Sequence, residues 1–127
     1  MQIQTSIDIE YEIQKLLNPY MTAYCRPLPK DFTTPCILVT HVGGSDTNTI
    51  DTFEIVLDSR AERESQAVAL LNKATGILRK IAGDRNTAVK YVKVTSSGSW
   101  GVDPVRPDLA MCSARMSVTA HLETTNI

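Results

Sequence analysis

Apolar and polar positions along the chain follow two periods, one typical of helices and one typical of strands. The helical period first appears in "DIEYEIQKLLN", residues 8–18. The apolar face of this stretch consists of Ile9, Ile13, Leu16 and Leu17, and Pro19 follows it. The spacing predicts a helix over residues 8–18 that stops at the proline.

A longer helical stripe lies in the middle of the chain. Its members are Ala67, Leu70, Leu71, Ala74, Ile77, Leu78 and Ile81. Ser59 followed by Glu62 fits a capping box, in which a hydroxyl and a carboxylate bond the free amides of the first helical turn. Gly83 is placed to close the helix in a left-handed conformation, beyond Arg79 and Lys80 at the favourable end of the helix dipole. We expect an amphipathic helix that packs on a sheet.

Strand patterns flank this helix on both sides. The apolar run "CILVTHV", residues 36–42, predicts a strand covered on both faces. In "IDTFEIVLD", residues 50–58, Phe53, Ile55 and Leu57 share one face. The turn-rich segment Gly43–Thr49 between the two runs predicts an antiparallel hairpin.

Two further strands are predicted after the second helix. The first covers residues 88–96, with Val92 and Val94 facing inward. The second has the clearest alternation in the chain, and one of its faces is small and apolar. That face consists of Ala110, Cys112, Ala114, Met116, Val118, Ala120 and Leu122. A short edge strand around residues 24–26 fits the proline-containing connector "YMTAYCRPLPKDFTTP".

The order of these elements predicts the fold class. It is an α+β domain, with two helices packed on one face of a mixed, largely antiparallel sheet of four to five strands. The length of 127 residues fits a single domain over residues 1–127.

The composition of the chain excludes only a few classes of function. Hydrophobic residues make up 43% of the chain, charged residues 21%, and the formal net charge is −1. With no basic block, we expect no specific nucleic-acid binding, and no apolar run approaches the roughly 18 residues of a membrane span. The start of the chain lacks the features of a signal peptide. Three widely spaced cysteines without a CxxC pair favour a reducing compartment.

Motifs for catalysis or for metal binding are not apparent. His41 and His121, with Cys36 or Cys112, lack the close spacing of a zinc site. No GxSxG elbow carries a nucleophile, and the turn at Gly43–Gly44 lacks the phosphate-binding patterns. We therefore expect no enzyme, no metal and no cofactor.

One stretch, "SSGSWGVDPVRPDLA", residues 96–110, sets the only tryptophan, Trp100, among glycines and prolines. The composition predicts a loop of about thirteen residues, since neither a helix nor a central strand fits it. Two interpretations stay open. Either the loop folds back and Trp100 plugs its own domain, or it reaches a neighbouring subunit, where Trp and Arg are favoured anchors.

Taken in order, the segments resemble those of the tail terminator (tail completion) proteins of long-tailed bacteriophages. The resemblance runs through an N-terminal helix, then "TTPCILVTHVGG", "IDTFEIVLDS", "ESQAVALLNKATGILRKI", "GVDPVRPDLA" and "CSARMSVTAHLE". It covers about the full chain but contains no strict motif.

The resemblance implies a structural role in the virion, after assembly in the host cytoplasm. Proteins of this family form a homohexameric ring that stops growth of the tail tube at its head-proximal end. Such a ring contacts the tail tube protein below and a head-completion or neck protein above. Because no strict motif of the family fixes the interface residues, loop composition alone leads us to expect Trp100, Arg106 and Asp108 at a subunit or partner contact. The Gly43–Thr49 loop is a second candidate surface.

Three other functions fit the same sequence. One is a head-completion or connector protein, or another minor tail protein, of the same neck. Another is a small α+β enzyme or ligand-binding module, which requires a deep apolar pocket with convergent polar groups. The third is a monomeric binder of cellular proteins, in which Trp100 stays exposed and the chain does not self-associate.

Overall fold

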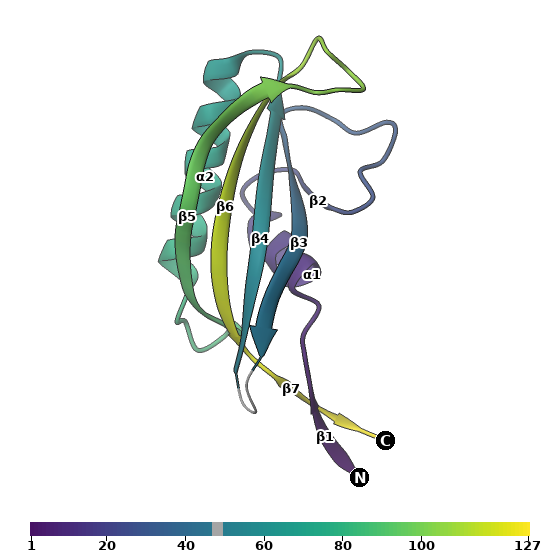
Figure 1. The fold of residues 1–127 in the computed structure, drawn as a ribbon, viewed down its shortest axis with the longest axis vertical. Coiled ribbons are helices and arrows are strands. Elements are labelled where there is room, and N and C mark those ends of the chain that lie inside the picture. Colours follow the sequence, from purple (N-terminus) through teal and green to yellow (C-terminus); the bar gives the residue numbers. More distant parts are fainter. Residues whose placement is uncertain (47–49) are drawn as a thin grey trace.

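In the computed structural model, which describes residues 1–46 and 50–127, the elements form two sheets and two helices (Figure 1). They are β1 (Gln2–Thr5), α1 (Ile9–Leu17), β2 (Ala23–Cys25), β3 (Cys36–Asp46), β4 (Ile50–Ala61), α2 (Glu64–Ile81), β5 (Val89–Val102), β6 (Ala110–His121) and β7 (Glu123–Asn126). The main sheet has the order β2-β3-β4-β6-β5, and β1 pairs with β7 in a separate two-stranded sheet.

This arrangement confirms the predicted α+β class. The β2–β3 pair is parallel and the other pairs of the main sheet are antiparallel, so the sheet is mixed and largely antiparallel. The total number of strands is larger than predicted, because β1 and β7 form a second sheet that the pattern did not indicate. These two strands carry mostly polar residues, and they lie together at the end of the molecule where both termini are found (Figure 1).

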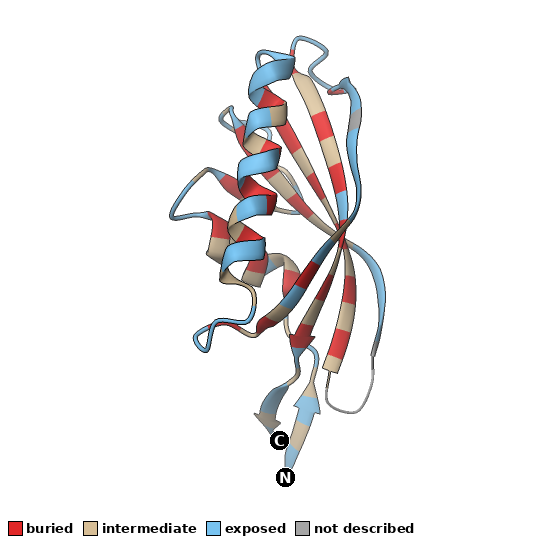
Figure 2. Cartoon of the chain, turned by 90° about the vertical axis from the view of Figure 1, so that its left-hand side faces the viewer, coloured by how far each residue is buried: buried red, intermediate tan, exposed pale blue. Residues whose placement is uncertain are grey.

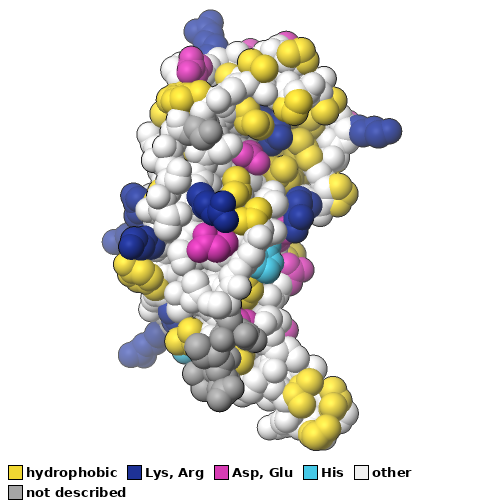
Figure 3. Space-filling model, in the orientation of Figure 1, with side chains coloured by type: hydrophobic (Ala, Val, Ile, Leu, Met, Phe, Trp, Pro, Cys, Tyr) yellow, Lys and Arg dark blue, Asp and Glu magenta, His cyan; other side chains and the backbone are white. Residues whose placement is uncertain are grey.

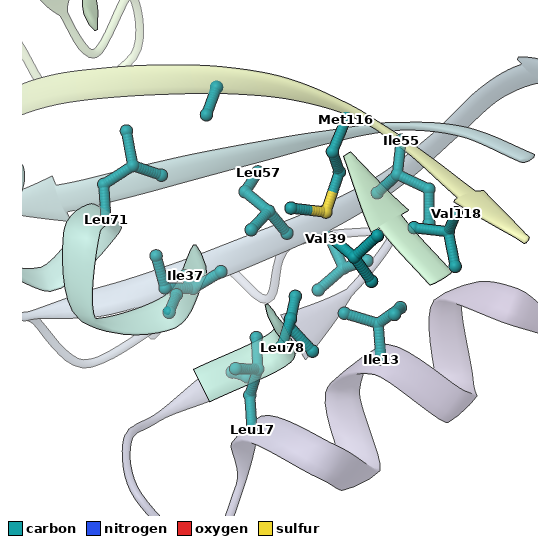
Figure 4. Close-up of a cluster of buried hydrophobic side chains, with 14 of the residues drawn as sticks. Ile13, Leu17, Ile37, Val39, Ile55, Leu57, Leu71, Leu78, Met116 and Val118 are labelled. Carbon is teal, nitrogen blue, oxygen red and sulfur yellow. The ribbon is translucent and has the colours of Figure 1, made fainter. Parts of the chain in front are cut away.

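Both helices pack on the same face of the main sheet (Figure 2). The inward residues of β3, β4 and β6 join the apolar stripes of α1 and α2 in one buried cluster. Figure 4 shows Ile13 of α1, Leu78 of α2 and Val39 of β3 pointing toward one another. Burial of these large apolar side chains is the main stabilising contribution to the fold.

The N-terminal helix forms as its sequence predicts. Asp8 caps it, because its carboxylate accepts a hydrogen bond from the backbone N–H of Tyr11. Ile9, Ile13 and Leu17 are buried, and the helix ends at Leu17, before Pro19. Helical spacing and the proline that follows were sufficient to identify this element, whereas the cap at Asp8 was not predicted.

The predicted start of the second helix was wrong. Ser59 lies inside β4 and is buried, and its hydroxyl donates hydrogen bonds to the carbonyls of Ala67 and Cys112 at 2.7 and 3.1 Å. The helix begins at Glu64, where Arg63 occupies the cap position without a side-chain cap bond. The hydroxyl of Ser59 therefore ties the sheet to the helix instead of capping the helix. At the other end, Gly83 follows the helix with φ +87°, as predicted.

The β3–β4 hairpin is confirmed, but its strands are longer than predicted. Gly43 to Asp46 belong to β3 and pair with Glu54 to Asp51, whereas residues 47–49 lie outside the described residues. Gly44 has φ +147°, and a Cβ there would lie 2.1 Å from the carbonyl oxygen of Thr52. The glycine is thus required by close backbone approach within a strand.

The face of the sheet opposite the helices is open along most of its length. Coverage of residues 36–42 on both faces was predicted, but it holds only at the beginning of β3: Cys36 is buried, Leu38 and Thr40 are half-buried, and Val42 is exposed. Cys36 is covered because two loops, residues 26–35 and residues 103–109, fold over that end of the open face.

The first of these loops, the connector of residues 26–35, is anchored to α1. Glu10 accepts hydrogen bonds from Nε and Nη2 of Arg26 at 2.9 and 2.5 Å, and from the backbone N–H of His41 at 3.0 Å. Burial works to raise the pKa of the Glu10 carboxyl, but these hydrogen bonds outweigh burial and lower the pKa. The ionised carboxylate therefore holds the start of the connector beside β3.

Candidate functional site

Trp100 lies in a strand, so the predicted loop over residues 96–108 was wrong. Strand β5 continues to Val102, and Trp100 pairs with Cys112 of β6. Glycine at positions 98 and 101 was compatible with strand structure because β5 is the last strand of the sheet, where irregular backbone is tolerated. The actual loop is shorter and covers residues 103–109.

Three bulges bend β5. Its register against β6 shifts between Val89 and Tyr91, between Val94 and Ser96, and between Ser97 and Ser99. Gly98, in the last of these bulges, has φ +82°, a conformation that glycine adopts without strain. Each bulge adds local twist and bends the strand. In Figure 2 the last part of β5 is exposed, while α2 stands over the other strands on the helix side.

This bending exposes a face of β5 that belongs, by register, to the core side. Residues directly opposite in an antiparallel pair share a face, and Cys112, opposite Trp100, is buried in the core. Yet 53% of Trp100 and 59% of Val102 are exposed. We call Trp100 and Val102, at the free edge of the sheet, the tryptophan edge.

Asp103 organises the loop that follows. Its backbone N–H donates to the carbonyl of Leu109 at 3.1 Å. Its Oδ1 accepts hydrogen bonds from the backbone N–H groups of Val105 and Arg106 at 2.8 and 3.2 Å. The carboxylate thus accepts hydrogen bonds from two backbone N–H groups of its own loop, as aspartate side chains do in turns.

The other oxygen of Asp103 binds a buried arginine. Nε of Arg60 donates to Oδ2 at 2.7 Å, and 10% and 4% of the two side chains are exposed. Burial works to raise the pKa of the Asp103 carboxyl, but the hydrogen bonds from Arg60, Val105 and Arg106 and the charge of Arg60 lower that pKa overall. Nη1 of Arg60 is buried with no hydrogen-bond partner among the described residues.

A pocket of about 600 Å³ opens above this ion pair, between the connector and the 103–109 loop. We call it the connector pocket. It is lined by Leu28, Pro29, Lys30, Phe32, Arg60, Asp103, Pro104, Val105 and Arg106. The guanidinium of Arg106 lies 5.5 Å from the centre of the Phe32 ring. Figure 3 shows hydrophobic side chains gathered around basic ones at this end of the molecule.

The structure brings together two of the three predicted interface residues. Nη2 of Arg106 lies 3.2 Å from Oδ2 of Asp108, an exposed ion pair on the 103–109 loop. Trp100 lies on the opposite face of the sheet from Arg60, because Arg60 pairs with Met111, whose neighbour Cys112 faces the core. The predicted residues therefore divide between two surfaces at one end of the molecule.

Sequence reasoning missed Arg60, Leu28 and Phe32 as site residues. Arg60 stands at the end of an apolar strand, where a cation ordinarily reaches water. In the structure β4 continues to Ala61, and both neighbours of Arg60 are buried as well, which no local signal in the sequence indicated. Leu28 and Phe32 lie between the prolines of the connector, and no local period indicates that they line a pocket.

The second predicted surface, the Gly43–Thr49 loop, lies partly outside the described residues. Its described part borders a smaller pocket of about 320 Å³, lined by Ser6, His41, Gly43, Gly44, Ser45, Asp51, Thr52 and Phe53. Asp51 is buried there and accepts a hydrogen bond from the hydroxyl of Ser6. Nε2 of His41 donates to the carbonyl of Gly43 at 2.7 Å.

Within residues 1–46 and 50–127, no group of three or more His, Cys, Asp or Glu side chains is placed to hold a metal ion. Neither described helix is long and apolar enough to cross a membrane. No protein-family model matches the chain, and no curated protein matches it.

Proposed function

We propose that the chain is a subunit of a bacteriophage tail terminator. In this role copies of the chain form a homohexameric ring on the head-proximal end of the tail tube, stop tube polymerisation and present a surface to the head-completion or neck protein. The protein acts in the virion, at the head–tail junction. Its contacts are with itself, with the tail tube protein and with the neck protein, and none of them requires catalysis.

The tryptophan edge is the observation that supports this proposal most. Large aromatic residues are enriched at the centres of protein interfaces, and an uncovered strand edge offers backbone groups to another chain. In this molecule both features coincide on the distal half of β5, from Thr95 to Val102. A ring subunit needs such a surface, because each copy must contact its neighbours.

The chemistry of the Arg60–Asp103 pair also favours a structural role. A general acid must hold its proton near neutral pH, which requires a raised carboxyl pKa. The pKa of Asp103 is lowered instead, and both of its oxygens bind groups that shape the loop. The pair therefore serves to hold the 103–109 loop against β4.

A ligand-binding module is the second candidate, because the connector pocket has the size and lining typical of small-molecule sites. Its walls are mainly apolar, and Lys30, Arg60 and Arg106 give it polar groups. Soaking with a fragment library and solution binding assays separate this function from a ring. Ligand binding by a chain that stays monomeric at all concentrations favours the module.

The proposed function is tested by native mass measurements over a concentration series, with negative-stain images of any large species. We expect a six-fold ring with an open centre, and added density at one end of purified tail tubes incubated with the protein. A strict dimer, or a protein that leaves both tube ends unchanged, contradicts the proposal. Binding to isolated heads but not to tubes favours a head-completion protein.

A further inference from the structure

We propose that the tryptophan edge of one chain docks into the connector pocket of a second copy, in a head-to-tail contact that repeats around the assembly. This proposal rests on the tail terminator function only for the number of subunits that close the ring. The contact itself depends only on the shape and chemistry of the two surfaces.

The two surfaces lie at one end of the sheet but on opposite faces. Trp100 is on the helix-side face, in register with Cys112, whereas the connector pocket covers Arg60 on the open face. The tryptophan edge protrudes and the pocket is hollow, so neither surface is self-complementary. Contacts between two different surfaces of the same chain are heterologous, and they produce closed rings or open filaments instead of two-fold dimers.

Size and chemistry match across the proposed contact. A tryptophan side chain buries roughly 150–250 Å² when it docks. The pocket, at about 600 Å³, is large enough to receive it, and Leu28, Pro29, Phe32 and Pro104 give it apolar walls. The guanidinium of Arg106, already over the Phe32 ring, provides a cation for the face of an incoming indole.

Charged side chains surround the pocket. Lys30, Arg60 and Arg106 line it together with Asp103, and Asp108 pairs with Arg106 on its rim. An indole that enters the pocket therefore approaches cations, which attract the electron-rich face of an aromatic ring.

Docking of one side chain is too small for a stable interface, since stable contacts bury about 800 Å² on each partner. The free edge of β5 next to Trp100 must therefore contribute as well. Val102 and the exposed residues Thr95 to Gly98 supply that additional area. Each contact is then moderate in strength, and assembly depends on protein concentration.

Paired variants test the contact directly. Trp100→Ala removes the protruding side chain but keeps the pocket, and Leu28→Asp charges the pocket but keeps the tryptophan. We expect each variant alone to associate at least about tenfold more weakly than the unmodified chain, as for other aromatic anchors. An equimolar mixture regains one productive contact per pair, so it should form a 1:1 heterodimer and nothing larger.

Controls keep the experiment decisive. Tyr91→Ser changes an equally exposed aromatic residue of β5, 61% exposed and paired with Thr119, and should assemble like the unmodified chain. Circular dichroism and the thermal transition confirm that each variant folds. If Leu28→Asp unfolds, Val105→Asp replaces it, because Val105 is 86% exposed on the pocket rim.

The possible outcomes separate this contact from the proposed function. A mixture that stays monomeric while both variants fold overturns the contact, as does normal assembly of Trp100→Ala or an unmodified chain that never self-associates. If the heterodimer forms but the unmodified assembly ignores tail tubes, the contact stands and the tail terminator function fails. If Trp100→Ala still caps tubes as a ring, the function stands and the contact fails.

Discussion

The two halves of β5 belong to one continuous strand but have opposite environments in the structure. The proximal half, Val89–Val94, lies beneath α2, and Val89 and Val92 are buried. The distal half, beginning at Thr95, is exposed at every residue whose burial is described, although Trp100 and Val102 are large and apolar. The bulge between Val94 and Ser96, followed by the bulge between Ser97 and Ser99, directs the distal half away from the helix.

Different interactions hold the two halves in place. The proximal half is stabilised by apolar packing beneath a helix, whereas the distal half depends on its ladder with β6 and on the residue that follows it, Asp103. One half is therefore part of the core, and the other is an exposed part of the sheet edge. A strand that continues from core to surface can present an aromatic anchor without a flexible loop.

The largest loss of unfolding free energy is expected from Asp103→Asn, which releases the distal half of β5 from Arg60. The change leaves the guanidinium of Arg60 buried without its counter-charge, which typically costs about 3–5 kcal/mol of unfolding free energy. Denaturant titration monitored by circular dichroism gives this value. Asp108→Asn is the matched control on the same loop, and its exposed pair with Arg106 should contribute less than about 1 kcal/mol. Equal losses in the two variants contradict the role assigned to Asp103.

Met116→Ala disrupts the proximal half from the neighbouring strand. Met116 is fully buried and pairs with Val94, so truncation leaves a cavity and should cost about 2–5 kcal/mol. Thermal unfolding followed by calorimetry measures the loss. Ser117→Ala, one residue further along β6 and on the opposite face, should change stability by less than about 1 kcal/mol. A small effect at Met116 means that this half is less tightly packed than the structure indicates.

Acid should weaken the ion pair between Asp103 and Arg60, which holds the end of the distal half of β5. The pKa of Asp103 is lower in the folded chain than its ordinary value of 3.8, so its stabilising contribution is fully present above pH 3.8. The contribution is lost as the pH falls through the lowered folded value. We expect unfolding free energies measured from pH 7 to pH 2 to fall more steeply below pH 3.8 for the unmodified chain than for Asp103→Asn. Parallel curves contradict this assignment.

The smallest effect on stability is expected from Trp100→Ala. The side chain is half-exposed in the single chain, so its removal should change the unfolding free energy of the monomer by less than about 1 kcal/mol. The same variant should greatly weaken self-association. Thermal transitions at a concentration low enough to keep the chain monomeric measure the first effect. A loss of several kcal/mol of monomer unfolding free energy means instead that Trp100 packs against its own domain.

Local signals in the sequence predicted most of the elements. The apolar stripe of α1, the alternation of β6 and the left-handed Gly83 each depend on residues close together in the chain. The same kind of signal failed at Ser59, whose hydroxyl bonds carbonyls eight and 53 residues away. A capping box describes only local partners, and it does not reveal a tertiary hydrogen bond.

The candidate site was less predictable because it depends on pairing between distant segments. Glycine and proline around Trp100 indicated a loop, but an edge strand with bulges accommodates Gly98 and Gly101. The pocket joins the connector to a loop more than 70 residues later. The sequence identified Trp100, Arg106 and Asp108 as unusual, and only the fold places them on two faces.

The fluorescence of Trp100 tests the central claim most directly, because it is the only tryptophan in the chain. Emission spectra and acrylamide quenching are measured through a dilution series, with native mass measured at each concentration. We expect shielded, blue-shifted emission in the assembly and red-shifted, quenchable emission after dissociation, with the same midpoint as the change in mass. An indole that stays exposed in the full assembly, or shielded in the monomer, contradicts the account.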